Sequence, residues 1–164
     1  MSRPPDGGPG TAASVRAANR TLDEELRAVM SRVTDAQLHL RTAPDEWTVA
    51  EQLGHISEFP VCFATQLRAW RRDRSVPVGR THESADRLAG VARAAGRDAG
   101  ALHGEATAAL AELEGALAEL TDRDLASPTR NVKYGDEPLS AFLERYVIGH
   151  KRAHAAQLRA TLGR

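Results

Sequence analysis

The stretch YVIGHKRAHAAQLR, residues 146–159, places two histidines four residues apart within a segment that has the spacing of a buried helix face. Side chains four apart lie on the same face of an α-helix, about 6 Å apart along its axis. His150 and His154 fall on an apolar stripe that recurs every three or four residues, so we expect both to point inward. The stripe comprises Leu139, Phe142, Leu143, Tyr146, Ala153 and Leu158.

Two neighbouring buried imidazoles cannot both be charged at low cost, and each needs a polar partner. A shared metal ion is one partner that satisfies both, since neutral imidazole binds zinc, nickel, iron or copper. A third histidine, His55, lies on or beside the apolar face of another predicted helix. Three ligands with an open position are typical of a catalytic metal site, whereas structural zinc usually has four protein ligands. The alternative is that these histidines are ordinary core residues, because spacing alone does not make two helices neighbours.

The composition favours one helical domain. The chain has 164 residues and is rich in alanine, leucine, arginine and glutamate, with few aromatic or β-branched residues. Its proline- and glycine-rich start predicts a disordered tail over residues 1–13, followed by a single domain over residues 14–164. Balanced charges, 22 basic and 22 acidic, give no electrostatic argument for a nucleic acid or membrane surface as a partner.

One cysteine excludes an intrachain disulfide and fits a reducing compartment. No apolar run reaches the length of a membrane span, and the N-terminus lacks the hydrophobic segment of a signal peptide. These features predict a soluble, cytoplasmic protein. Helical bundles of this size often dimerise, so a homodimer is also expected, although no surface for it can be identified.

Four main helices are expected. Apolar periodicity predicts helices over residues 14–33, 48–72 and 138–162, and no strand pattern competes. The second begins with a capping-box pattern, Thr48 and Glu51, and Pro60 inside it predicts a kink. Residues 81–120 read as helical throughout, but Gly96, Gly100 and Gly104 predict a break that leaves a main helix over about 101–120. The fold class is therefore all-α, a four-helix bundle.

The segments WTVAEQLGHI (47–56) and GHKRAHAAQLR (149–159) resemble the DinB-like superfamily of bacterial four-helix bundles. That superfamily includes S-transferases that use bacillithiol or mycothiol, and mycothiol-dependent maleylpyruvate isomerases. Its mark is a tryptophan, then serine or threonine starting a helix, a histidine about eight residues on, and a late H-x-x-x-H-x-x-Q element. The resemblance covers about residues 20–162.

By this resemblance, His55, His150 and His154 form a metal triad and Gln157 is the trailing glutamine. Trp47 and Thr48 match the signature at the helix start. The isomerases usually carry an acidic residue within the triad and a further C-terminal domain. The three matching positions of this sequence are all histidine, so that specific reaction is not expected.

The predicted function is a metal-dependent thiol S-transferase that joins mycothiol or bacillithiol to a small electrophile, with zinc, nickel or iron in the triad. Metal-dependent hydrolysis, a non-catalytic binding or stress-related helical module, and a purely structural metal site remain alternatives.

Several further residues near the predicted triad are candidates for the site. Glu51, Glu58 and Gln157 are candidates to orient the imidazoles, against the alternative of solvated side chains. Tyr146 is a candidate to line a cavity or pack in the core. His82 is expected to be a surface histidine, with a place near the mouth of the site as the alternative.

The remaining features are expected to have lesser roles. His39 and His103 are expected to be incidental. The arginine-rich run RAWRRDR (68–74) is either the solvated end of a helix or a site of attraction for an anionic thiol.

Overall fold

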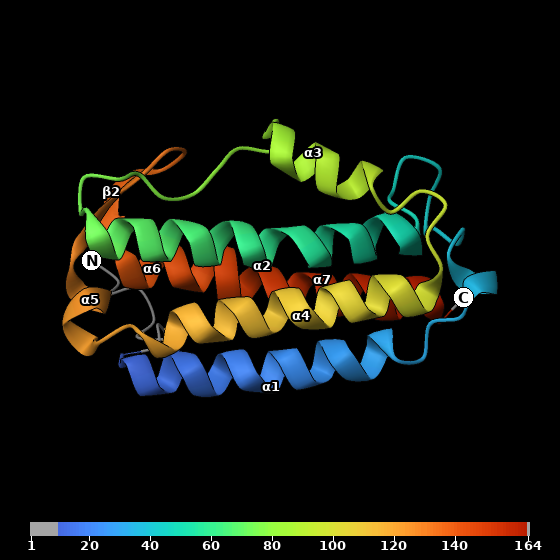
Figure 1. Ribbon diagram of the computed structural model, residues 1–164, viewed down its shortest axis with the longest axis horizontal. Coiled ribbons are helices and arrows are strands. Elements are labelled where there is room, and N and C mark those ends of the chain that lie inside the picture. Colours follow the sequence, from blue (N-terminus) through green and yellow to red (C-terminus); the bar gives the residue numbers. More distant parts are fainter. Residues whose placement is uncertain (1–9, 164) are drawn as a thin grey trace, which may run out of the picture.

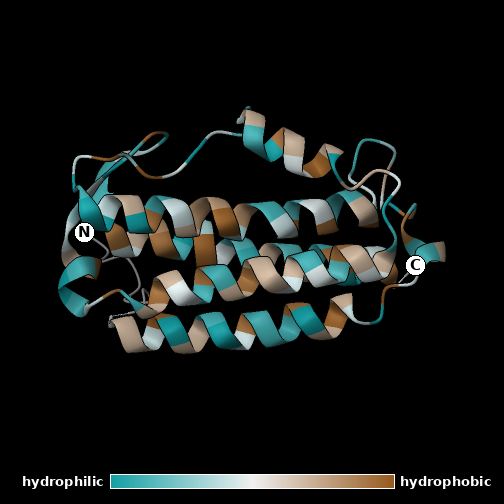
Figure 2. Ribbon diagram, in the orientation of Figure 1, coloured by the Kyte–Doolittle hydropathy of each residue, from teal (hydrophilic) through white to brown (hydrophobic). Residues whose placement is uncertain are grey.

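Four long helical segments lie side by side in the computed structural model, which describes residues 10–163 (Figure 1). They are α1 (Ala12–Met30), α2 (Val49–Arg72), α4 (Ala99–Ala118) and a C-terminal segment composed of α6 (Leu139–Leu143), η2 (Glu144–Ile148) and α7 (Gly149–Leu162). Hydrophobic and hydrophilic residues alternate along each of them (Figure 2), as expected of helices that bury one face. The predicted four-helix bundle is confirmed. The largest fully buried side chains include Trp70, Phe59, Phe63 and Phe142.

Capping side chains set where two of the helices begin. The Thr48 hydroxyl accepts from the Glu51 backbone N–H at 3.2 Å, and the Glu51 carboxylate accepts from the Thr48 N–H at 2.7 Å. The predicted capping box is therefore confirmed. Helix α1 is capped by Thr11 and Ser14, so it begins two residues before the predicted residue 14, and it ends at Met30 rather than residue 33. Residues 1–9 of the predicted disordered tail lie outside the described residues.

The predicted break within residues 81–120 is confirmed. Gly96 has φ of +73°, a conformation that favours glycine, and it separates α3 (Ala85–Ala92) from α4. Asp98 then caps α4 by accepting from the Ala101 N–H at 2.7 Å. Helix α3 lies outside the bundle, alongside α2 (Figure 1).

A two-stranded antiparallel hairpin corrects the expectation that the chain has no strands. Strands β1 (Pro128–Asn131) and β2 (Gly135–Pro138) follow the short helix α5 (Asp122–Ala126), and their register pairs Thr129 with Glu137. Val78, in the loop after α2, forms a parallel bridge with Asn131. The sequence does not indicate this hairpin because its strands are four residues long and mostly polar, so they lack the alternating apolar pattern of a strand.

The C-terminal segment is not the continuous α-helix that was predicted. Residues Glu144–Ile148 form a π turn, in which the Gly149 N–H donates to the Glu144 carbonyl. A π turn holds one residue more than an α turn, so it changes which residues of the following helix, α7, face the core. Beyond it Lys151 is buried, whereas Ala153, which was predicted on the inward stripe, is exposed.

The buried Lys151 joins α7 to α1. Its Nζ donates to Asn19 Oδ1 at 2.5 Å and pairs with the Asp23 carboxylate, which also accepts from Asn19 Nδ2 at 3.0 Å. Removing one partner would leave an uncompensated charge in the core, which is strongly destabilising. This cluster therefore fixes α7 against α1. No helix within residues 10–163 combines the length and apolar character needed to cross a membrane.

The close contact between α2 and α3 gives a first prediction. A Cβ atom at Gly54 would lie 2.8 Å from the Gly90 carbonyl oxygen. This oxygen belongs to the backbone of α3, which cannot easily move away from the added atom. We expect Gly54→Ala to destabilise the protein by about 1–3 kcal/mol, the usual cost of overpacking. Urea unfolding measures the change.

Gly104→Ala is the matched control for this prediction. Gly104 is an exposed position inside α4 where a Cβ would meet nothing within 4 Å, so this variant should gain about 0.5–1 kcal/mol. A Gly54→Ala variant as stable as Gly104→Ala would contradict the close packing of α3 on α2.

Candidate metal centre

The three predicted histidines converge between α2 and α7. His55 Nε2 lies 3.0 Å from His150 Nε2, and His154 Nε2 lies 3.1 Å from the same atom. One ligand atom from each ring can be chosen so that all three lie within 4.8 Å of one another. Two nitrogens bound to one tetrahedral zinc ion at about 2.1 Å are roughly 3.4 Å apart, so this spacing suits a shared ion.

Acceptors near the Nδ1 atoms of two histidines indicate that their Nε2 atoms carry lone pairs, which point into the centre of the triad. His154 Nδ1 lies 3.2 Å from Gln157 Oε1, an acceptor, so Nδ1 carries the proton and Nε2 a lone pair. His55 Nδ1 is buried without a hydrogen-bond partner and lies 3.7 Å from Glu58 Oε2, which favours the same tautomer. Both lone pairs face His150, whose single N–H can satisfy only one of them. A cation between the rings would satisfy all three, so the donor set fits a divalent transition metal.

Burial keeps the triad neutral. The pKa falls to about 2 for His55, about 3 for His150 and about 4 for His154, chiefly because each ring is removed from water. The positive charge that His154 carries when protonated lowers the pKa of the other two further. All three are therefore neutral near pH 7, and neutral imidazole is the form that binds a metal.

The aromatic rings of Phe59 and Trp47 pack against the imidazoles on one side of the triad. The Phe59 ring centroid lies 4.6 Å from that of His150, 5.3 Å from His55 and 5.8 Å from His154. The Trp47 ring lies 5.0 Å from His55. These contacts fix the ring positions and restrict water at this side of the centre.

Glu58 lies beside His55 of the triad and forms a buried ion pair with Arg80. Its two carboxylate oxygens accept from Arg80 Nη1 at 2.5 Å and Nη2 at 2.7 Å, a bidentate arrangement in which the side chains are 6% and 10% exposed. Since Glu58 also lies beside His55 Nδ1, it is placed to orient this imidazole. Glu51, the other acidic candidate, is used in the capping box instead.

A cavity of about 130 Å³ opens beside the triad. It is lined by His55 and His150, and Tyr146 lies on its wall with its hydroxyl donating to the Arg80 carbonyl at 3.2 Å. His82 is exposed, as predicted, and it also lines this cavity. Tyr146 also packs against Phe142, with ring centroids 5.1 Å apart, so both interpretations of this residue hold.

The other histidines, the single cysteine and the arginine-rich run lie outside the histidine group. His39 and His103 are not part of the histidine group, and neither is Cys62, whose thiol pKa is raised by burial. Arginines of the run 68–74 pair with acidic residues directly after α4 and within α5: Arg68 and Arg71 with Glu119, and Arg74 with Asp124. This pairing favours a structural role for the run, between helices, over attraction of an anionic thiol.

The family model described as the DinB superfamily matches residues 17–158. No curated protein matches the sequence.

Solved structures share the fold at low sequence identity. The mycothiol-dependent maleylpyruvate isomerase matches with a TM-score of 0.72 and 17% identity, over 90% of this chain and 60% of its own. This chain therefore spans about 60% of the length of that isomerase. YfiT from Bacillus subtilis, described as a probable metal-dependent hydrolase with an unusual four-helix bundle topology, matches with a TM-score of 0.71 and 14% identity, over 99% of this chain and 94% of its own. A DinB-like protein from Bacillus cereus matches with a TM-score of 0.65 and 18% identity, over 94% and 92%.

Metal binding by the triad gives a second prediction. Zinc or nickel should raise the melting temperature of the untagged protein, because a ligand that binds only the folded state stabilises it, by about 2.7 kcal/mol at a hundred times the dissociation constant. His150→Ala should abolish this rise, and elemental analysis should find the metal lost.

His39→Ala is the control for metal binding, since His39 is exposed and outside the histidine group. Far-UV circular dichroism of the metal-free His150→Ala variant should show an intact bundle. An unfolded variant would instead indicate a structural metal site, and a wild-type protein that binds no metal would contradict the site altogether.

The lowered pKa values give a third prediction, for the metal-free protein. The unfolded chain has histidine pKa values near 6.5, so between about pH 4 and 6.5 it binds more protons than the folded protein. The contribution of the neutral histidines to the free energy of unfolding is therefore fully present above pH 6.5. It is lost as the pH decreases below that value, by up to about 1.4 kcal/mol per pH unit for each histidine.

Urea unfolding at pH 7.5 and pH 5.0, with chelator present, measures this loss. His55→Gln should show a smaller loss than the wild type, whereas His39→Gln should match it. Equal losses in the wild type and His55→Gln would show that His55 is not held neutral by burial.

Proposed function

The chain belongs to the DinB superfamily, and we propose that it is a metal-dependent thiol S-transferase in which His55, His150 and His154 hold zinc, nickel or iron. The observation that carries the proposal is the convergence of three neutral imidazole nitrogens beside an open cavity. Three protein ligands leave a coordination position for a guest molecule, as catalytic sites require.

The residues around the cavity favour a nucleophile that comes from outside the protein. Among the described residues that line it, none is a cysteine, a serine or a carboxylate. A thiol substrate would fill this role, because a divalent metal beside it favours the thiolate, which is the nucleophilic form. The new carbon–sulfur bond forms as the electrophile's leaving group departs with its electron pair, and the thiol proton passes to solvent.

The side chains behind the triad would keep it in position for this reaction. Gln157 holds His154, and Glu58 lies beside His55 while remaining paired with Arg80. Phe59 and Trp47 exclude water from one side of the imidazoles. Mycothiol or bacillithiol is the proposed thiol. Support for mycothiol comes from the similar isomerase, which is described as mycothiol-dependent.

Metal-dependent hydrolysis is the second candidate. It is favoured by the likeness to YfiT, which is described as a probable metal-dependent hydrolase and matches over 94% of its own length. The same three histidines would serve, with water in place of the thiol as the nucleophile. Dependence on a thiol therefore separates the two candidates.

The fourth prediction tests this function directly. Zinc- or nickel-loaded protein should join mycothiol or bacillithiol to an electrophile such as 1-chloro-2,4-dinitrobenzene, with chloride released. Mass spectrometry of the thioether measures the product. His150→Ala should lose the activity, and Gln157→Ala should lose about 10- to 100-fold in activity or metal affinity because its hydrogen bond orients His154.

His39→Ala serves again as the control and should keep full activity. Turnover of a nitrophenyl ester without any thiol would favour the hydrolase. Absence of both activities, with the metal confirmed in place, would favour a non-catalytic binding module.

A further inference from the structure

Four cationic side chains line the cavity beside the triad: Arg80, Arg87, Lys133 and Arg145. They come from the loop after α2, from α3, from the turn between β1 and β2, and from η2. No aspartate or glutamate is among the described residues that line this cavity. Segments far apart in the sequence therefore bring positive charge to one small space.

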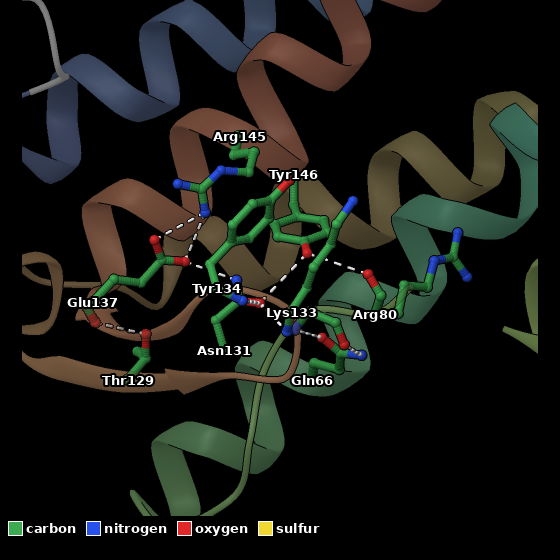
Figure 3. A network of polar contacts seen from close by, with 10 residues as sticks. Gln66, Arg80, Thr129, Asn131, Lys133, Tyr134, Glu137, Arg145 and Tyr146 are labelled. Atoms are coloured by element: carbon green, nitrogen blue, oxygen red, sulfur yellow. Dashed lines mark hydrogen bonds and ion pairs between the residues drawn. The ribbon is translucent and has the colours of Figure 1, made fainter. Parts of the chain in front are cut away.

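Two of the four cations are neutralised within the protein. Arg80 forms the bidentate pair with Glu58. Arg145 donates through Nη1 to both oxygens of Glu137, at 2.8 and 2.9 Å, as Figure 3 shows. Neither guanidinium needs a further anion.

The other two cations have no carboxylate partner within residues 10–163. Arg87 donates through Nη1 to the His82 carbonyl at 2.9 Å, and its guanidinium lies 4.7 Å from the Trp47 ring centroid. Lys133 Nζ lies 5.3 Å from the ring centroid of the neighbouring Tyr134. Burial and the adjacent Arg80 both lower the pKa of Arg87, so its charge is held at a cost that an anion would offset.

The backbone that carries Lys133 is held in place by a polar network (Figure 3). Asn131 Oδ1 accepts from the N–H groups of Lys133 at 2.9 Å and Tyr134 at 3.2 Å, and Asn131 Nδ2 donates to Glu137 Oε1 at 2.7 Å. The bridge to Val78 joins this turn to the loop that carries Arg80. Lys133 is thus presented to the cavity from a fixed turn, an arrangement that lowers the cost of ordering a binding site.

We propose that the cavity selects a small organic acid, whose carboxylate is held by Lys133 and Arg87 while the rest of the molecule faces the histidine triad. An unpaired lysine and an unpaired arginine are suitable partners for a carboxylate. A volume of about 130 Å³ suits a small acid. That this acid is the electrophilic substrate rests on the proposed function, whereas the anion site itself depends only on residues of this chain.

Binding of succinate to the metal-free protein, followed by calorimetry or by NMR shifts, tests the proposal. Succinate should bind, and succinamide, its neutral counterpart, should bind at least about tenfold more weakly. Binding should weaken as salt increases, since charge drives it. Lys133→Gln and Arg87→Gln should each weaken succinate binding about five- to tenfold.

The control variant is Arg32→Gln. Arg32 is exposed and follows directly after α1, whose C-terminal end lies at the opposite end of the bundle from the hairpin (Figure 1). Its succinate affinity should equal that of the wild type. Equal binding of succinate and succinamide, or loss of less than twofold in both cavity variants, would overturn the proposal. Because these measurements use no metal, they separate the anion site from the proposed function: a protein that binds metal but not succinate contradicts only this inference.

Discussion

Three imidazole nitrogens facing one another are the constraint on which the rest of this site depends. His55 and His154 direct lone pairs at His150, inside a region dry enough to prevent protonation near neutral pH. Lone pairs that face one another repel, and a single shared N–H cannot satisfy three rings. A divalent cation removes the conflict, which is why this arrangement indicates a metal centre more strongly than any of the three histidines alone.

The fold meets this constraint by fixing two helices independently of the metal. Helix α2 begins at its capping box and carries His55 two turns later, where Phe59 and Trp47 hold the ring. Helix α7 is fixed from its other side, because Lys151, next to His150 in sequence, is buried against α1. The π turn before Gly149 sets which face of α7 reaches α1 and which reaches α2.

Much of the bundle could be predicted because the sequence signals that determine its helices are local. The spacing of apolar residues, the pair Thr48 and Glu51, and the glycine at position 96 each act within a few residues, so they located the helices and the break. The triad could be predicted as a set of candidates from spacing, and the family resemblance supplied the expectation that they meet. Its convergence is confirmed; metal binding stays a prediction.

What could not be predicted depends on contacts between distant segments. The hairpin is polar and short, and its strands are held by partners such as Val78 and Glu137, which no periodicity reveals. The cations of the cavity lie at positions 80, 87, 133 and 145, and only the folded chain gathers them. In contrast, the arginine-rich run over residues 68–74 pairs with acidic residues directly after α4 and within α5. Charge density along a sequence was therefore a poor guide to charge at the site.

Anomalous X-ray diffraction from zinc-loaded crystals tests the central claim most directly. A metal shared by the triad predicts one strong peak at the zinc edge, with the Nε2 atoms of His55, His150 and His154 each about 2.1 Å from it. A map with no peak between these rings, from crystals that contain ample zinc, would show that three facing imidazoles do not make a metal site in this protein.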